Sequence, residues 1–112
     1  WVAGFSFGAW VAMQLLMRRP EINGFISVSP PANLRDFSFL APCPSSGLIV
    51  HGDKDNIASF DSSKILSEKL QKQKKVEILF KSIKGADHFY ENYKEEFSQI
   101  VDNYIKDKLF TE

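Results

Sequence analysis

The 112-residue sequence has little from which a disulfide, a surface of one charge or a membrane anchor could be built. It contains one cysteine, Cys43, so no disulfide can form within the chain. Lys plus Arg and Asp plus Glu both number 14, so net charge attracts neither nucleic acid nor an anionic membrane. No stretch is long and apolar enough for a signal peptide or a transmembrane helix. We therefore expect no nucleic-acid partner, no membrane attachment and, from the lone cysteine, a reducing, cytoplasmic setting.

The composition is that of one packed domain. Hydrophobic residues make up 44% of the chain and charged residues 25%, which is typical of a protein with a buried core. The length falls within the range of about 100 to 200 residues that a single domain occupies. Trp1 to Ala3 have the character of a strand that is already under way. We therefore expect residues 1–112 to form a single domain that is truncated before Trp1.

Short apolar segments alternate with segments of helical pattern along the chain. Strands are predicted at 1–3, 25–28, 48–50 and 76–80, and helices at 9–19, 60–74 and 89–105. The first helix is apolar on almost every side, which predicts burial on more than one face. The strand 76–80 alternates apolar and polar residues, as a half-exposed strand near a sheet edge does. The alternation of elements predicts an α/β fold with a mainly parallel sheet and helices on both faces.

A G-x-S-x-G motif, Gly4-Phe5-Ser6-Phe7-Gly8, lies between the first predicted strand and the first helix. In that context a sharp turn exposes the serine hydroxyl above the sheet, and a Cβ at either glycine would collide with the neighbouring strand or helix. The same turn aims the backbone N–H of Phe7, at the positive end of the helix dipole, toward a developing oxyanion. We therefore expect Ser6 to be a nucleophile and Phe7 an oxyanion-hole donor. A glycine-rich turn with an incidental serine is the alternative interpretation.

Residues that could activate a serine follow two later strands. Asp53 and Asp55 follow the strand 48–50, and His88 follows the strand 76–80, at the carboxyl edge where α/β folds bind ligands. Serine is a weak nucleophile until an imidazole takes its proton, and the imidazole needs a carboxylate to fix its tautomer. The order serine, acid, histidine along the chain is that of α/β-hydrolases, whereas chymotrypsin and subtilisin use other orders.

Spacing alone leaves alternatives for the base and for the acid. His51 is the second histidine, but it lies at the strand end beside the acids, where a structural histidine is more usual, so His88 is favoured as base. Asp53 and Asp87 compete with Asp55 as the acid. Asp87 adjoins His88 and would have to fold back on its neighbour.

Three segments, GFSFGAWVA, GLIVHGDKD and IKGADHFY, resemble hydrolases of the α/β superfamily that are akin to dienelactone hydrolase and the acyl-peptide hydrolases. The resemblance spans essentially the whole chain and implies that Ser6, Asp55 and His88 form the catalytic triad. It implies the C-terminal half of an α/β-hydrolase fold, holding the end of the fifth strand and the sixth to eighth. The loop that supplies the second oxyanion-hole donor belongs to the missing N-terminal half. The 30–46 connection, where larger relatives insert a lid, is then only a loop, which implies a shallow, open pocket.

The sequence thus predicts a serine hydrolase that cleaves an ester, thioester or amide-like acyl bond of a small molecule through an acyl-enzyme. No metal and no organic cofactor are expected, and the fragment alone is expected to be inactive. The alternative is a non-catalytic protein that keeps the fold for binding or scaffolding, because fold alone never proves activity. The complete set of serine, aspartate and histidine favours the enzyme.

Overall fold

The computed structural model of the chain describes residues 1–40 and 42–110. Its elements are β1 (Val2–Phe5), α1 (Phe7–Arg18), β2 (Phe25–Val28), the 3₁₀ turn η1 (Ser38–Leu40), β3 (Gly47–Gly52), α2 (Phe60–Gln71), β4 (Ile78–Ile83) and α3 (Lys94–Phe110). The predicted domain of residues 1–112 and the predicted 30–46 loop include positions 41, 111 and 112, which lie outside the described residues.

The described strands form one parallel sheet in the order β1-β2-β3-β4. This confirms the predicted parallel sheet, and it places β4 at an edge of the described sheet, as the alternating pattern predicted. Strands β3 and β4 pair from Gly47 beside Ile78 to Gly52 beside Ile83. Because every residue of β3 has a partner, β4 extends three residues beyond the predicted range 76–80. Because the strands are parallel, the carboxyl ends that precede the candidate site residues all lie along the same side of the sheet.

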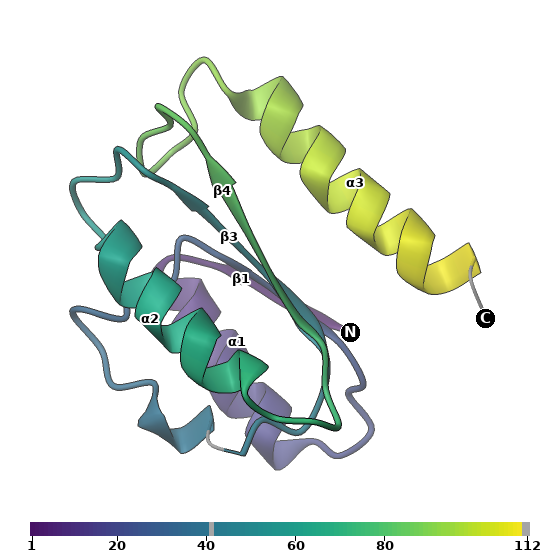
Figure 1. Cartoon of the computed structure of the whole chain (residues 1–112). Helices are drawn as coiled ribbons and strands as arrows, with labels where there is room; N and C mark the ends of the chain where they lie inside the picture. The colour runs from purple at the N-terminus through teal and green to yellow at the C-terminus, as the bar shows by residue number, and fades with distance from the viewer. Residues whose placement is uncertain (41, 111–112) are drawn as a thin grey trace.

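Helices cover both faces of the sheet, with α1 and α2 on one face and α3 on the other (Figure 1). Two clusters of buried side chains fill the layers between sheet and helices. The cluster beneath α1 and α2 includes Met13, Leu16, Phe25, Ile49 and Leu70, and the cluster beneath α3 includes Ile26, Val28, Leu48, Val50 and Tyr104. Successive residues of β3 alternate between the two clusters, as the period of two in a strand requires. The predicted two-sided arrangement is confirmed.

Helix α1 is buried on one face only, so the prediction of burial on more than one face is wrong. Its buried residues are Ala9, Ala12, Met13 and Leu16. Val11, Leu15 and Met17 point away from that face and are 40–48% exposed. The helix packs on β1, β2 and η1, and β1 is the end strand of the described sheet. The outer side of α1 therefore faces away from the rest of the described chain.

Helix α3 begins at Lys94, whereas the apolar periodicity predicted a helix over 89–105. Tyr90 and Asn92 have positive φ angles of 57° and 67°, which the interior of a right-handed helix excludes. Phe89 follows the helical spacing but is 56% exposed. Local backbone geometry, which the spacing of apolar residues does not reveal, therefore delays the start of the helix.

Candidate active site

Ser6 lies on a sharp turn between β1 and α1. Its backbone angles, φ 55° and ψ −121°, fall outside the regions that L-residues normally occupy. Its N–H donates to the carbonyl oxygen of Val28 at 2.8 Å, and its own carbonyl oxygen accepts from the N–H of Ala9 at 2.8 Å. These bonds tie the turn to the end of β2 and to the first turn of α1. The serine is thus held in a strained conformation at the carboxyl edge of the sheet.

The two glycines of the motif have different surroundings. A Cβ on Gly4 would lie 2.2 Å from the carbonyl oxygen of Gly8 and 2.8 Å from the Cα of Ala9, which backbone atoms cannot accommodate. A Cβ on Gly8 would meet no atom of the described chain within 4 Å. The predicted collision is therefore confirmed for Gly4 and wrong for Gly8, because Gly4 faces the first turn of α1 whereas Gly8 points away from the described elements.

His88 lies between Ser6 and Asp55. Its Nε2 is 3.0 Å from Oγ of Ser6, and its Nδ1 is 2.6 Å from Oδ2 of Asp55. A carboxylate only accepts, so we assign the ring proton to Nδ1, which leaves the lone pair of Nε2 facing the serine hydroxyl. His88 is 3% exposed, so water competes little for either bond. The structure thus brings together the three residues that the sequence predicted as nucleophile, base and acid.

The carboxylate of Asp55 is fully buried and accepts hydrogen bonds on both oxygens. Its Oδ1 accepts from the backbone N–H groups of Ile57 and Ala58, both at 2.8 Å. Burial raises the pKa of Asp55, but the hydrogen bonds from His88, Ile57 and Ala58 outweigh it and hold the pKa below its ordinary value. Asp55 is therefore charged at neutral pH and stabilises a proton on Nδ1 of His88.

The turns that follow β3 and β4 are joined directly. The N–H of Lys54 donates to the carbonyl oxygen of Ala86 at 3.0 Å, and Oδ1 of Asp53 accepts from the N–H of Gly85 at 2.7 Å. A Cβ on Gly52 would lie 2.4 Å from the carbonyl oxygen of Ala86, so a glycine is needed for this approach. The joined turns bring the acid segment and the histidine segment together.

The competing acids from the sequence bond elsewhere in the described structure. Asp53 bridges to the backbone of Gly85, as above, and Oδ1 of Asp87 accepts from the N–H of Glu91 at 2.8 Å. Both carboxylates cap turns, whereas the carboxylate of Asp55 contacts histidine rings. Of these three carboxylates, that of Asp55 is therefore the one hydrogen-bonded to His88 in the described structure.

His51 is fully buried and lies against Asp55. Its Nε2 is 3.0 Å from Oδ2 of Asp55 and 2.9 Å from the carbonyl oxygen of Ala58. Burial lowers the pKa of His51 below its ordinary value, so this ring is neutral at neutral pH. The sequence favours a structural role for His51 but does not reveal this contact with the acid, for which the spacing of four residues within HGDKD is the one signal.

A buried pair of hydroxyl groups, which is also not predicted from the sequence, supports the turn that carries His88. Oγ of Ser29 lies 2.8 Å from the hydroxyl of Tyr90, which donates to the carbonyl oxygen of Val50 at 3.2 Å. Oγ of Ser29 also lies 3.4 Å from the carbonyl oxygen of His88. Burial raises the pKa of Tyr90 to about 12, so the phenol stays neutral. No sequence pattern links a serine and a tyrosine 61 positions apart.

Aromatic residues flank Ser6 in the sequence, and two aromatic rings pack against His88. The rings of Phe5 and Phe89 lie 5.2 and 5.0 Å from the ring of His88, and the ring of Phe7 lies 5.5 Å from that of Trp10. Phe5, Phe7 and Phe89 are 42–56% exposed. His88 therefore lies beside exposed apolar rings in the described chain.

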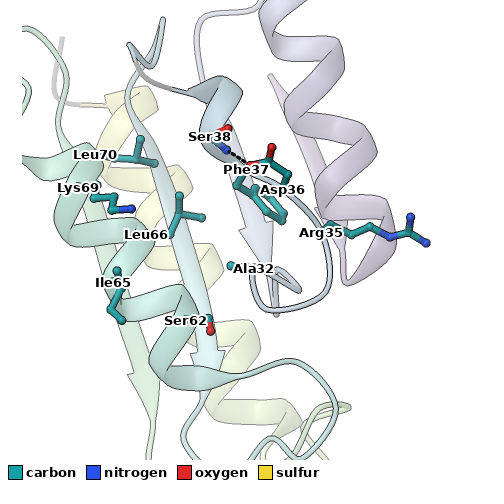
Figure 2. A pocket seen from close by; sticks show the side chains of 10 residues that line it. All are labelled: Ala32, Arg35, Asp36, Phe37, Ser38, Ser62, Ile65, Leu66, Lys69 and Leu70. Atoms are coloured by element: carbon teal, nitrogen blue, oxygen red, sulfur yellow. Dashed lines mark hydrogen bonds between the residues drawn. The ribbon is translucent and has the colours of Figure 1, made fainter.

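The hollow drawn in Figure 2 is separate from these residues. It has a volume of about 290 Å³ and lies between α2 and the connection that contains η1. The side chain of Arg35 points away from it toward α1 (Figure 2), where the guanidinium lies 4.9 Å from the centre of the Phe7 ring. Neither Ser6, Asp55 nor His88 lines the hollow. It is therefore not part of the hydrogen-bonded site.

The rest of the described chain offers little other chemistry of this kind. Within residues 1–40 and 42–110, no three His, Cys, Asp or Glu side chains form a group that could hold a metal ion. In the same residues, no helix is long and apolar enough to cross a membrane. Cys43 is buried, and burial raises the pKa of its thiol, which disfavours the nucleophilic thiolate.

The sheet is parallel and has helices on both faces (Figure 1). Its strand ends bring a serine on a strained turn, a histidine and a buried aspartate into one hydrogen-bonded line. This arrangement defines an α/β-hydrolase fold. The model of the dienelactone hydrolase family matches residues 1–108. The chain belongs to this family.

Relatives from several bacteria agree with this assignment. An uncharacterized protein of Rickettsia prowazekii is 53% identical over 108 residues, which is 93% of this chain and 45% of the relative. The crystal structure of a protein of unknown function from Agrobacterium tumefaciens, described as a candidate α/β-hydrolase, superposes with a TM-score of 0.95 at 51% identity, over 97% of this chain and 50% of that one. An α/β serine hydrolase without a lid from Xanthomonas campestris gives a TM-score of 0.80 at 27% identity, over 93% and 45%. The chain thus spans about half the length of these relatives.

Proposed function

We propose that this chain carries the catalytic triad of a serine hydrolase that cleaves an ester, thioester or amide-like acyl bond of a small molecule. One observation carries the proposal: Nε2 of His88 lies 3.0 Å from Oγ of Ser6 while Nδ1 lies 2.6 Å from Oδ2 of Asp55. These are hydrogen-bond distances for a nucleophile, a base and an orienting acid. Membership of the dienelactone hydrolase family supports a hydrolytic activity.

In the proposed reaction, Oγ of Ser6 attacks the acyl carbon as Nε2 of His88 takes the hydroxyl proton. The carboxylate of Asp55 stabilises the imidazolium, which then gives its proton to the leaving group. A water molecule attacks the acyl-enzyme, with His88 again acting as the base, and the acid product leaves Ser6 with its proton restored. Neither a metal nor an organic cofactor takes part in these steps.

The oxyanion of each tetrahedral intermediate needs hydrogen-bond donors. Phe7 is the first residue of α1, and a backbone N–H at that position has no partner within its helix and lies at the positive end of the dipole. We propose this N–H as one donor and assign the second to residues outside the chain. Loss of a single donor costs about 3 to 4 kcal/mol of transition-state stabilisation, so residues 1–112 alone are proposed to be inactive.

We also propose a type of substrate and a cellular location. The exposed rings of Phe5, Phe7 and Phe89 favour an apolar acyl group. The small substrate is proposed to reach an open site, because the described part of the 30–46 connection forms only the short η1. The balanced charge and the single reduced cysteine favour a cytoplasmic enzyme that binds neither nucleic acid nor membrane.

The experiment is turnover of a panel of aryl esters and thioesters by the full-length natural protein and by its Ser6→Ala variant. We expect Ser6→Ala to lower kcat by on the order of 10⁶-fold, as removal of a triad nucleophile does elsewhere. Ser62→Ala, at a half-buried position in the first turn of α2, is the matched control and should keep full activity. Equal turnover by the wild type and Ser6→Ala would refute the mechanism, and no turnover of any substrate by the wild type would leave a non-catalytic binding protein of the same fold.

A further inference from the structure

One oxygen of Asp55 lies within hydrogen-bond distance of two histidine rings. Oδ2 is 2.6 Å from Nδ1 of His88 and 3.0 Å from Nε2 of His51. The side chains of Asp55 and His51 are both fully buried, and that of His88 is 4% exposed. The mechanism above uses His88 and leaves the contact with His51 without a role.

The partners of His51 fix its protonation. Nε2 faces two acceptors, Oδ2 of Asp55 and the carbonyl oxygen of Ala58 at 2.9 Å, so the proton lies on Nε2 and is shared between them. Nδ1 is buried and has no hydrogen-bond partner in the described structure. A proton on Nδ1 would be a buried donor without an acceptor, which is costly, so His51 is a neutral donor through Nε2.

His51 also restrains the segment that carries the acid. It is in β3, and its bond to Ala58 closes the turn of residues 52–58 around Asp55. The N–H of Ala58 in turn donates to Oδ1 of Asp55 at 2.8 Å. The carboxylate is therefore held through both oxygens, with Oδ2 directed toward His88.

Resting on the proposed function, we propose that His51 is a positioning residue of the triad: its Nε2–H holds Oδ2 of Asp55 in the orientation that His88 needs. A neutral donor suits this role, because a charged imidazolium at the same place would compete with His88 for the negative charge of Asp55. His51 contacts neither the reacting serine nor, by this proposal, the substrate.

The test compares His51→Phe, which keeps a planar ring without a donor, with His51→Gln, whose amide N–H can replace Nε2–H. Both are made in the full-length natural protein, and activity is normalised to sites that react with a fluorophosphonate. We expect His51→Phe to lower kcat by on the order of tenfold to a hundredfold with KM unchanged, and His51→Gln to recover most of it. The loss is below the about 10⁴-fold that follows when the triad aspartate no longer fixes the base.

A control separates positioning from a general loss of stability. Leu70→Ala removes a buried side chain of α2, so it should lower the melting temperature without changing kcat per reactive site. A kcat of His51→Phe within twofold of wild type would overturn the proposal. Wild-type protein that neither reacts with the fluorophosphonate nor turns over an ester would instead refute the proposed function.

A second measurement does not depend on the variant folding. In wild-type protein labelled with ¹⁵N-histidine, NMR reports the tautomer of each ring, and we expect His51 as the Nε2–H form at neutral pH. The Nδ1–H tautomer would overturn the proposal, because it leaves no proton on Nε2 between Asp55 and Ala58. A protonated His51 would also overturn it, because its charge would compete with His88 for Asp55.

Discussion

Nδ1 of His88 lies 2.6 Å from Oδ2 of Asp55, although the two residues are 33 positions apart and follow different strands. The joined turns after β3 and β4 create this contact. The contact predicts an asymmetry between the two acidic residues of HGDKD. Asp55→Asn should lower kcat/KM by on the order of 10⁴-fold, because an amide leaves His88 in the wrong tautomer.

Asp53→Asn is the matched control for that measurement. Asp53 accepts from the backbone N–H of Gly85 and contacts neither histidine in the described structure, so its replacement should cost less than about tenfold in kcat/KM. Steady-state assays of both variants decide the assignment. Equal losses, or a larger loss for Asp53→Asn, would contradict Asp55 as the acid.

The free energy of unfolding should decrease as the pH is lowered, in two separate pH ranges. Below about pH 6.5 an unfolded His51 binds a proton that the buried ring resists, so the free energy of unfolding falls as pH falls. Below about pH 3.9 the same argument holds for Asp55, whose folded pKa is lowered. The urea midpoint is measured from pH 8 to pH 3. We expect its decrease below about pH 6.5 to be absent in His51→Gln and its decrease below about pH 3.9 to be absent in Asp55→Asn. Unchanged slopes in both variants would show that other groups are responsible.

Tyr90→Phe should destabilise the protein by about 1 to 3 kcal/mol, because it leaves Oγ of Ser29 and the carbonyl oxygen of Val50 buried with fewer partners. Tyr93→Phe is the control, since Tyr93 packs against the same buried cluster but takes no part in the hydrogen bonds between Ser29, Tyr90 and Val50. Denaturant unfolding of the two variants measures the difference. A loss for Tyr93→Phe equal to that for Tyr90→Phe would mean that the buried hydroxyl pair contributes nothing specific.

The motif glycines should also differ. Gly4→Ala places a Cβ against the backbone of Gly8 and Ala9, so we expect a loss of about 3 kcal/mol in the free energy of unfolding. Gly8→Ala enters open space in the described chain and should change that free energy by no more than about 0.5 kcal/mol. Thermal unfolding of each variant tests this, and equal losses would show that Gly8 is covered in the full-length natural protein.

Much of the fold could be predicted because it depends on local patterns. Short apolar runs such as 25–28 and 48–50 are buried on both faces, as parallel strands are. Ser6, Asp55 and His88 each follow a predicted strand, and parallel strands end at one edge, so their proximity could be predicted as well.

The remainder depends on geometry that the sequence pattern does not contain. The delayed start of α3 follows from positive φ angles at Tyr90 and Asn92. The one-sided burial of α1 follows from the position of β1 at the end of the described sheet. The contact between His51 and Asp55 depends on which way a buried ring points, and the residue types alone do not determine that.

Covalent labelling tests the central claim most directly, because only a serine whose proton is taken by a base attacks a fluorophosphonate readily. The full-length natural protein is incubated with the probe, digested and analysed by mass spectrometry. We expect one stoichiometric adduct on the peptide that contains Ser6 and none in the Ser6→Ala variant. An unlabelled wild type, or an adduct on another residue that persists in Ser6→Ala, would contradict it.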